Sequence, residues 1–339
     1  MRARRSGQLL GATLLGALLL CCCCVQAAPV LPIDHPSASA GASTTVTGYQ
    51  TNYVWKSRGT YETFDRACVL TKERPIPVVL LPGMLSPGLV TTRYMAHRLQ
   101  DAGYCVYQLE YGLGLMDTLV GVQDMRASAH DLALFVDKVL NITGAQQVDL
   151  VGHAEGSLVS LWYLRKLGGE KHIRRFSGIA PLFRGTTFRG LITILKGLNF
   201  YDTLAILIEQ FCPACTQVVE RSPFLQELHT TVFDPNAPPM PSVSTVNYLM
   251  VMTNGDEVVT PFFSGYLDDV GDETKVKHVI VEDICESAVG GGGSSGIGAV
   301  LSLLPLRHVG LMFSPLVFAL VDGFLTPESE RPVLDCQTT

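Results

Sequence analysis

Residues 152–156 have the spacing of a nucleophile site but lack the nucleophile. They read Gly-His-Ala-Glu-Gly, which keeps both glycines of the G-x-S-x-G motif and has Ala154 at its centre. In that motif the central residue lies on a sharp strand-to-helix turn that exposes its side chain for attack on a carbonyl carbon. Gly152 and Gly156 are needed because the turn is strained and neighbouring Cβ atoms would collide with the strand or the helix. Alanine has no oxygen, so the stretch predicts a catalytic scaffold without its reactive atom.

Two residues further along the chain complete the order nucleophile, acid, histidine. Asp256 directly follows an apolar stretch at 246–252, and His308 comes just before an apolar stretch at 311–325. In such a triad the imidazole takes the proton of the nucleophile, while the carboxylate fixes the imidazole tautomer and stabilises its charge. Ser157 supplies the nearest hydroxyl to Ala154. It lies inside the predicted helix, so we expect no substitute nucleophile there.

A regular alternation of strands and helices positions these residues. Residues 147–151 read as a strand, and the helix after the motif has Leu158, Leu161 and Trp162 on one face and Gly168 as its C-cap. Strands that alternate with helices at this pace form βαβ units. The sequence therefore predicts an α/β fold with a mostly parallel central sheet and helices on both faces. The other predicted strands are 76–81, 104–109, 176–180, 246–252 and 278–282, and the other predicted helices are 91–102, 128–140 and 311–325.

Two segments interrupt this alternation. Residues 188–211 are apolar and helical in pattern, and they are either a lid or cap that presents apolar surface to lipid or an ordinary pair of core helices. Residues 290–298 read GGGGSSGIG, a flexible tract of low complexity between the acid and histidine candidates.

The composition fits one large folded domain. The chain has 339 residues, of which 47% are hydrophobic and 17% are charged. A net charge of −6 argues against a nucleic-acid partner. No group of Cys and His residues has the spacing of a zinc site, so we expect no metal and no cofactor.

The first 27 residues have the pattern of a secretory signal peptide. Three arginines precede an apolar run at 9–25, and small residues precede a cleavage site after Ala27. The alternative is an uncleaved anchor with palmitoylated cysteines at 21–24. Because the run is shorter than the ~20 residues of a membrane-spanning helix, we expect cleavage and a secreted, extracellular protein. Residues 28–67 are predicted to be a partly disordered arm.

Six of the ten cysteines lie beyond this leader. An even number in a secreted chain predicts disulfides, and the residues alone leave the connectivity open. The sequence Cys-Pro-Ala-Cys also has the spacing of a redox motif, without the thioredoxin-like pattern around it. Asn141 begins a glycosylation sequon that we expect on a surface turn. The disulfide candidates are Cys68, Cys105, Cys212, Cys215, Cys285 and Cys336.

Between about residues 68 and 325 the chain resembles the secreted class 2 lipases of bacteria and fungi, which belong to the α/β-hydrolase superfamily. The similar stretches are VVLLPGM, DAGYCVYQLEYG, VDLVGHAEGSLVSLWYLRKLGG, GIAPLFRGTT, CPAC, TNGDEVVTPFFSGYL and RHVGLMFSP. The resemblance implies an α/β-hydrolase domain at 68–328 with a small helical cap at about 186–240. A C-terminal tail follows at 329–339.

Position by position, the resemblance places Ala154 where the nucleophilic serine stands. It makes Asp256 the acid and His308 the base. It assigns the oxyanion hole to the backbone N–H groups of Met84 and Glu155.

The resemblance also has implications for residues outside the triad and the oxyanion hole. It implies that Cys68 pairs with Cys105, and that His153 points away from the pocket and is structural. Two departures from the family pattern stand out: residues 81–84 read Leu-Pro-Gly-Met where the family often has His-Gly, and the Gly/Ser tract before His308 looks like an insertion.

These features predict a secreted protein of lipase or esterase descent, with a pocket for a carboxylic ester or an acylglycerol. Loss of the serine from a triad lowers turnover by about 10⁶-fold, so the protein as it stands is expected to be inactive or severely impaired. The alternative is a non-enzymatic protein that holds a lipid or a protein partner in the acyl pocket. A third reading is a hydrolase that uses another nucleophile.

Overall fold

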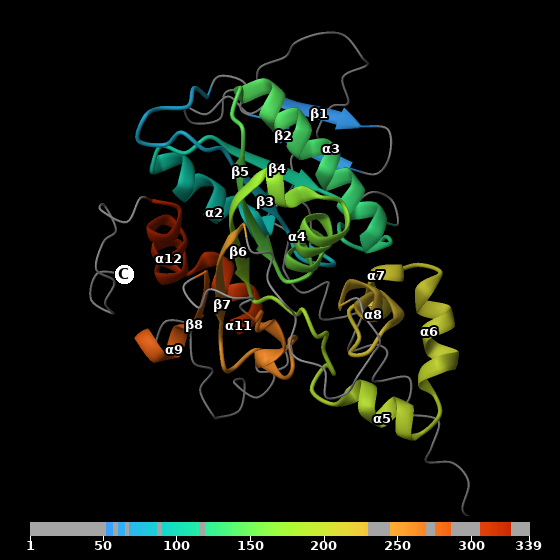
Figure 1. Ribbon diagram of the computed structural model, residues 1–339. Coiled ribbons are helices and arrows are strands. Elements are labelled where there is room, and N and C mark those ends of the chain that lie inside the picture. The colour runs from blue at the N-terminus through green and yellow to red at the C-terminus, as the bar shows by residue number, and fades with distance from the viewer. Residues whose placement is uncertain are drawn as a thin grey trace, which may run out of the picture. The chain divides into compact units, whose positions relative to one another are not determined.

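An eight-stranded sheet organises the molecule (Figure 1). The computed structural model describes residues 52–56, 60–64, 68–86, 90–114, 119–229, 245–268, 275–285 and 306–326, all of which belong to one compact unit. In spatial order the strands are β1 (Asn52–Lys56), β2 (Thr60–Phe64), β4 (Val106–Glu110), β3 (Val78–Leu81), β5 (Val148–His153), β6 (Ile173–Ile179), β7 (Asn247–Met252) and β8 (Val276–Ile280).

Six of the strands, from β4 to β8 in this order, pair in parallel. The predicted parallel sheet is therefore confirmed, and each predicted strand is present with ends that differ by a few residues. All four residues of β3 are buried, as expected for a central strand covered on both faces.

Two strands come from the region predicted to be a partly disordered arm. β1 and β2 form an antiparallel pair, and β2 adds to β4 at the edge of the sheet. The sheet therefore begins at Asn52, earlier than the domain start predicted at Cys68. The predicted leader, the tract at 290–298 and the tail at 329–339 lie outside the described residues.

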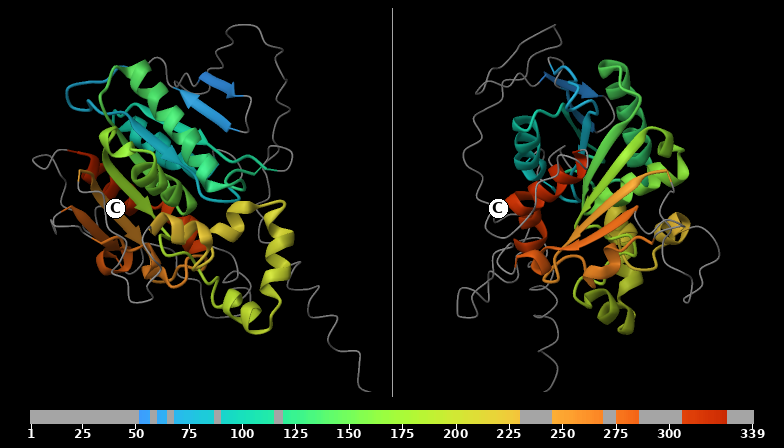
Figure 2. Two further views of the ribbon diagram at one scale, coloured as in Figure 1. Left: turned by 45° about the vertical axis from the view of Figure 1, so that its right-hand side comes forward. Right: turned by 60° about the vertical axis from the view of Figure 1, so that its left-hand side comes forward.

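Helices cover both faces of the sheet (Figure 2). On one face lie α3 (Met125–Thr143) and α4 (Glu155–Lys166), and on the other lie α2 (Val90–Asp101) and α12 (Pro315–Leu325). α3 starts a little before the predicted helix because Asp124 caps it, accepting the Arg126 N–H at 2.7 Å. It ends at Gly144, which takes the left-handed conformation common at helix C-termini.

The C-terminal helix predicted at 311–325 is broken at Ser314. A short helix, α11 (Leu306–Gly310), continues into one 3₁₀ turn, η4 (Leu311–Phe313), and α12 starts only after Ser314. Ser314 is extended because it precedes Pro315, and its hydroxyl caps α12 by accepting the Val317 N–H at 3.4 Å. The remaining short elements are η2 (Gly169–Lys171), α7 (Pro213–Gln217), α8 (Pro223–His229), η3 (Phe262–Gly265) and α9 (Val281–Ile284).

The apolar segment at 188–211 forms a hairpin of two helices, α5 (Leu191–Gly197) and α6 (Tyr201–Glu209), which we call the α5–α6 hairpin (Figure 1). Neither helix has a buried residue, so the prediction of an ordinary core pair is wrong. In the described part of the chain no single helix is long and apolar enough to cross a membrane. Two bent pairs, this hairpin and α11 to α12, meet that test by length and composition.

Candidate active site

β5 ends in a sharp turn at Ala154 and α4 starts directly after it. Ala154 has φ 47° and ψ −116°, a backbone conformation that residues other than glycine rarely adopt. Its N–H donates to the Ile179 carbonyl at 2.9 Å, and its own carbonyl accepts the Ser157 N–H at 2.9 Å. The strained turn is thus held from both sides, which is the condition under which strain persists in folded proteins.

Both glycines of the motif are required by close backbone contacts. A Cβ on Gly152 would lie 2.8 Å from the carbonyl carbon of Gly156. A Cβ on Gly156 would lie 2.7 Å from the carbonyl oxygen of Pro82, in the loop after β3. Any side chain at these positions would push the strand, the helix and the loop apart.

The loop after β3 lies against the turn. A Cβ on Gly83 would lie 3.1 Å from Cβ of Ala154 and 2.9 Å from Nδ1 of His153. The Tyr111 hydroxyl donates to the Pro82 carbonyl at 2.7 Å and fixes the start of the loop. A glycine at position 83 is therefore what allows the loop to approach the turn.

Asp256 and His308 form a buried pair. Nδ1 of His308 lies 2.8 Å and 3.1 Å from the two carboxylate oxygens of Asp256. The same carboxylate accepts the N–H groups of Val258 at 2.8 Å and Val259 at 2.7 Å. Burial disfavours the charged carboxylate, but the contact with His308 and the two N–H groups outweigh it and hold the pKa of Asp256 below its ordinary value. Nδ1 faces Asp256, so Nε2 is the nitrogen of the His308 ring that takes no part in this contact.

A second carboxylate in the same loop holds the backbone of the histidine. Glu257 accepts the His308 N–H at 3.2 Å and the Arg307 N–H at 3.2 Å. These are N–H groups at the start of α11, which have no partner within the helix. Asp256 thus orients the ring of His308 and Glu257 fixes its backbone, so one loop sets the histidine in place. Glu257 was not among the residues predicted from the sequence.

His153 packs against His308, whereas the resemblance implied that it points away. The two ring centres are 4.8 Å apart, and Nε2 of His153 lies 3.3 Å from the His308 carbonyl. Burial, followed by the charge of His308, lowers the pKa of His153 to about 3, so it is neutral near pH 7. Since a carbonyl only accepts, the proton of His153 lies on Nε2. Because His153 precedes Ala154, this contact brings His308 to the turn.

Glu155 has a buried carboxyl group with no hydrogen-bond partner among the described residues. Only 1% of the residue is exposed, and burial raises its pKa well above the ordinary value, which favours the protonated carboxyl. Oε2 of Glu155 and Cα of Met84 both lie where a Cβ on Gly121 would be. The side chain of Glu155 and the backbone of Met84 therefore both lie against Gly121, and the role of their N–H groups in an oxyanion hole stays a prediction.

The exposed fractions of the three predicted catalytic positions are small. They are 8% for Ala154, 7% for Asp256 and 5% for His308. The two described cavities, of about 430 Å³ and 280 Å³, lie elsewhere, between the α5–α6 hairpin and α7 and α8. Their lining includes Lys196, Glu220 and Arg221 but none of the three predicted catalytic positions.

Comparison with known proteins gives a fold but no sequence family. The sequence matches no family model and no curated protein. Among solved structures, the chain is similar to Aspergillus fumigatus lipase B, with a TM-score of 0.54 and 22% identity over 77% of this chain and 58% of that one. It is also similar to the mature form of Bacillus licheniformis lipase BlEst2, with a TM-score of 0.51 and 15% identity over 80% of this chain and all of that one.

The chain has the α/β-hydrolase fold. It spans little more than half the length of the Aspergillus protein. At these identities the likeness is one of fold. The chemistry of the chain has to be argued from its own residues.

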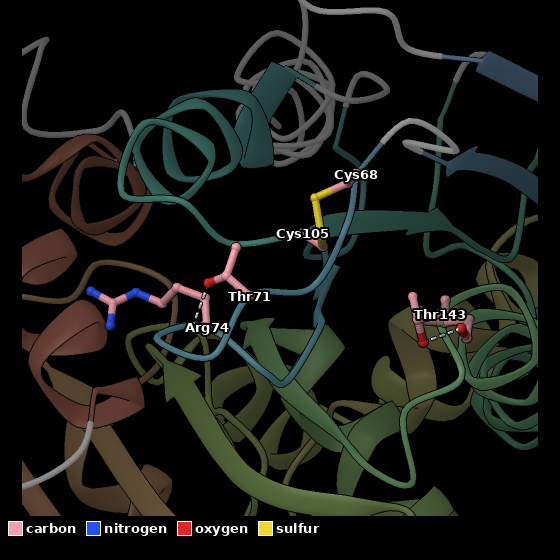
Figure 3. The surroundings of a disulfide bond; sticks show 6 residues. Cys68, Thr71, Arg74, Cys105 and Thr143 are labelled. Atoms are coloured by element: carbon pink, nitrogen blue, oxygen red, sulfur yellow. Dashed lines mark hydrogen bonds between the residues drawn. A yellow bond between two sulfur atoms is a disulfide. The ribbon is translucent and has the colours of Figure 1, made fainter.

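Two disulfides brace the described part of the chain. The Cys68–Cys105 pair, implied by the resemblance, is confirmed and ties the segment before β3 to the start of β4 (Figure 3). Cys212 and Cys215 bond to each other at the start of α7, at the base of the α5–α6 hairpin. Cys285 is also disulfide-bonded, and Cys336 lies outside the described residues.

The sequon lies in a helix and not on the surface turn that we expected. Asn141 is exposed in the last turn of α3, and the Thr143 hydroxyl donates to the Val139 carbonyl at 2.7 Å (Figure 3). Exposure keeps the amide of Asn141 accessible, and its glycosylation stays a prediction.

Proposed function

We propose that this protein is a lipase-like α/β-hydrolase that has lost its nucleophile and cleaves esters at most at a trace rate. One observation carries the proposal: Ala154 occupies a turn of the strained kind used for a nucleophile, while Asp256 and His308 are hydrogen-bonded beside it. Restoring a single oxygen at position 154 would complete a serine triad. The inherited substrates are carboxylic esters or acylglycerols, the class named by the lipases of similar fold.

The size of the expected loss of activity follows from the absence of the serine hydroxyl at position 154. Without the serine no acyl-enzyme forms, and turnover falls by about 10⁶-fold relative to an intact triad. The N–H groups of Met84 and Glu155 would still polarise a bound carbonyl. An oxyanion hole and substrate binding alone leave roughly 10³-fold to 10⁴-fold acceleration over water, which a routine assay does not detect.

The test compares the unmodified chain with Ala154→Ser on p-nitrophenyl butyrate and tributyrin. We expect no measurable cleavage by the former and clear cleavage by the latter. The double variant Ala154→Ser with His308→Ala is expected to lose it again. A folded Ala154→Ser protein without ester cleavage refutes the proposal. So does turnover by the unmodified chain, which would point to another nucleophile.

We further propose that the α5–α6 hairpin contacts a lipid surface. Its large apolar side chains project into solvent: Ile194, Leu198, Phe200, Ile206, Leu207 and Phe211 are each more than half exposed. Clustered apolar exposure on this scale marks an interaction site. The bent pair also has the length and apolar composition of a membrane-seeking segment. In this reading the protein holds a lipid or an ester at an interface without cleaving it, which is the non-enzymatic alternative predicted from the sequence.

We also propose that the protein is secreted. The leader predicted at 1–27 supports this, and so do the disulfides Cys68–Cys105 and Cys212–Cys215, since disulfides persist in oxidising compartments. Expression in a secreting host tests it. We expect the protein in the medium, with its N-terminus at residue 28, and a membrane-bound product with an intact leader would contradict secretion.

A further inference from the structure

We propose that the two cavities between the α5–α6 hairpin and helices α7 and α8 bind the headgroup of a zwitterionic phospholipid, a phosphodiester joined to a quaternary ammonium. The inference deepens the proposed lipid contact of the hairpin and rests on it, because the hairpin would bring the lipid to the cavities. It does not involve the triad, since neither cavity is lined by Ala154, Asp256 or His308. The headgroup would be bound by charge and by an aromatic ring, and no bond of the lipid is broken.

The first argument is that α6 has two different sides. Tyr201, Ala205 and Glu209 line the larger cavity, and their spacing of i, i+4 and i+8 places them on one side of the helix. Leu207 follows Ala205 by two residues, which is about 200° of rotation around the helix axis. It is 56% exposed. The apolar side of α6 is therefore turned away from the cavity.

α5 is divided in the same way. Lys196 lines both cavities, while Ile194, two residues before it and on the opposite side of the helix, is 59% exposed. In Figure 1 the two helices lie beside α7 and α8, at one end of the molecule. The hairpin thus has an apolar side that faces solvent and a polar side that faces a cavity.

The second argument is depth in a membrane. An amphipathic helix at an interface buries its apolar side about 5–10 Å into the boundary between headgroups and acyl chains. An α-helix with its side chains is about 10–12 Å across. With the apolar side of the hairpin in the acyl boundary, its opposite side lies at the level of the phosphates and ammonium groups. The cavities on that side are therefore at the right depth for a headgroup.

The third argument is the charge that remains after pairing. Of the charged side chains that line the larger cavity, Lys196 and Glu209 form no ion pair with the described residues. The other charges of the lining occur in the neighbouring pairs Asp124–Arg126 and Glu220–Arg221. One cation and one anion without a partner fit a ligand that carries one charge of each sign.

The phosphodiester would lie between Lys196 and Arg221, which both line the two cavities. The pair of Arg221 with Glu220 is exposed, with 65% and 42% of the two side chains accessible. Such exposed pairs contribute little to stability, so the guanidinium can turn to a ligand. A guanidinium binds a phosphate through two parallel N–H groups, and a lysine adds a point charge.

The ammonium would lie on the ring of Tyr201. Nζ of Lys196 already lies over this ring, 4.9 Å from its centre, so a cation can reach that ring face. Burial, followed by the charges of Asp202 and Glu209, raises the pKa of Tyr201, which places the ring in a negative field. Aromatic ring faces recognise quaternary ammonium groups. When the phosphodiester draws Lys196 away, the ammonium of the ligand takes its position.

The size of the site and the charge of the whole chain favour a zwitterionic lipid. The larger cavity measures about 430 Å³, within the range of small-molecule sites. The net charge of −6 disfavours an anionic membrane, because the protein as a whole is repelled from it. A phosphocholine headgroup carries no net charge and avoids this repulsion.

The first experiment is isothermal titration of the full chain with glycerophosphocholine, which is the headgroup without acyl chains. The comparison ligands are choline and glycerophosphoglycerol, which has the same phosphodiester but no ammonium. We expect glycerophosphocholine to bind at least about tenfold more tightly than either. Lys196→Gln should weaken its binding by at least about tenfold. Glu209→Gln should weaken it by about threefold and should not weaken glycerophosphoglycerol binding.

Lys171→Gln is the matched control for Lys196→Gln, because it removes the same charge from another exposed lysine. Lys171 lies in η2, before β6, whereas the hairpin follows the other end of that strand. Glycerophosphocholine affinity should stay within about twofold of that of the unmodified chain. An equal loss in the two variants would show that overall charge decides, and it would overturn the inference.

Equal affinity of the unmodified chain for glycerophosphocholine and glycerophosphoglycerol overturns the inference as well. If circular dichroism shows that a variant has not folded, the comparison of the three ligands on the unmodified chain decides alone.

The second experiment separates a membrane lipid from a free headgroup. Co-sedimentation is measured with vesicles of dioleoyl phosphatidylcholine, of dioleoyl phosphatidylglycerol and of dioleoyl digalactosyldiacylglycerol, which contains no phosphate. We expect binding to phosphatidylcholine to be at least about tenfold tighter than to either of the others, and Lys196→Gln to remove this preference. Glycerophosphocholine binding without a preference among the vesicles would mean a soluble ligand and would overturn the assignment to a lipid.

Failure here is distinguishable from failure of the proposed function. Equal binding to all three kinds of vesicle, with no affinity for glycerophosphocholine, leaves the lipid contact of the hairpin intact and removes the headgroup site. Binding of glycerophosphocholine with no binding to any vesicle removes the lipid contact and, with it, the assignment to a lipid. Ester cleavage by Ala154→Ser is unaffected by either result.

Discussion

Two apolar helical regions of this molecule have opposite surroundings. In α4, which follows the turn at Ala154, ten of the twelve residues are buried, and strand, helix and loop meet there at backbone contact distance. The α5–α6 hairpin is more apolar in sequence than α4, yet none of its helical residues is buried. Apolar composition alone therefore does not report burial. The difference suggests that α4 fixes the geometry of the turn at Ala154, whereas the hairpin presents an apolar surface to solvent.

A matched pair of glycine substitutions gives the largest expected contrast between the regions. Gly152→Ala forces a Cβ to within 2.8 Å of Gly156 and should destabilise the fold by about 3 kcal/mol. Gly197→Ala, in α5, meets nothing within 4 Å and should be neutral or stabilise by up to about 1 kcal/mol. Urea unfolding of both variants measures this. Similar losses of stability in the two would contradict the contrast.

A pH-dependent stability difference is expected for Glu155→Gln. Above about pH 4.5 the carboxyl is ionised in the unfolded chain but protonated in the folded one, so the unmodified protein loses stability as pH rises toward the raised pKa of Glu155. Glutamine does not titrate. Between about pH 4.5 and the raised pKa of Glu155, the unfolding free energy of the variant should therefore rise relative to that of the unmodified protein by about 1.4 kcal/mol per pH unit. Below about pH 4.5 the difference should not change with pH. Unfolding curves at several pH values test this, and a pH-independent difference would argue against a protonated Glu155.

A smaller effect is expected for Glu257→Gln. In the Ala154→Ser background it should lower kcat by about tenfold and leave KM nearly unchanged, because a neutral amide holds the two N–H groups of α11 less firmly. The pH profile of kcat should shift as well, since His308 is less well oriented toward Asp256. Glu227→Gln, on a half-exposed side chain paired with Arg126, is the control and should change neither. An unchanged kcat and pH profile would remove Glu257 as a positioning residue.

The smallest effect on stability is expected in the hairpin. The double variant Phe200→Ser with Ile206→Ser changes two side chains that are 64% and 63% exposed, so the unfolding free energy should move by less than about 0.5 kcal/mol. Binding to phosphatidylcholine vesicles, followed by co-sedimentation, should nevertheless fall severalfold. Undiminished vesicle binding would show that the hairpin is not the lipid-contacting surface.

The sequence predicted the central sheet well because its strands are continuous apolar runs buried on both faces, as β3 shows. It missed β1 and β2, since an antiparallel edge pair has no such run and lies in a stretch rich in polar residues. The break at Ser314 could have been found from the following proline. The exposure of 188–211 could not have been found from the sequence, because hydrophobic periodicity does not say whether a partner surface exists.

In the candidate site, the sequence predicted the three positions that a motif or the chain order marks: Ala154, Asp256 and His308. It did not predict Glu257 or Gly121, because their roles depend on contacts between loops that are distant in sequence. It also placed His153 away from the pocket, whereas its ring packs on His308. Such contacts have no local signature in the sequence, so these supporting residues of the site could be identified only from the structure.

The most direct test of the central claim is covalent labelling of Ala154→Ser by a p-nitrophenyl alkylphosphonate, followed by intact-mass spectrometry. The reagent requires a nucleophile, a base and an oxyanion hole in register, and it does not depend on a preferred substrate. We predict one adduct per chain, mapped to position 154, that is absent from the unmodified protein and from the double variant with His308→Ala. A folded Ala154→Ser protein that takes no label would contradict the account.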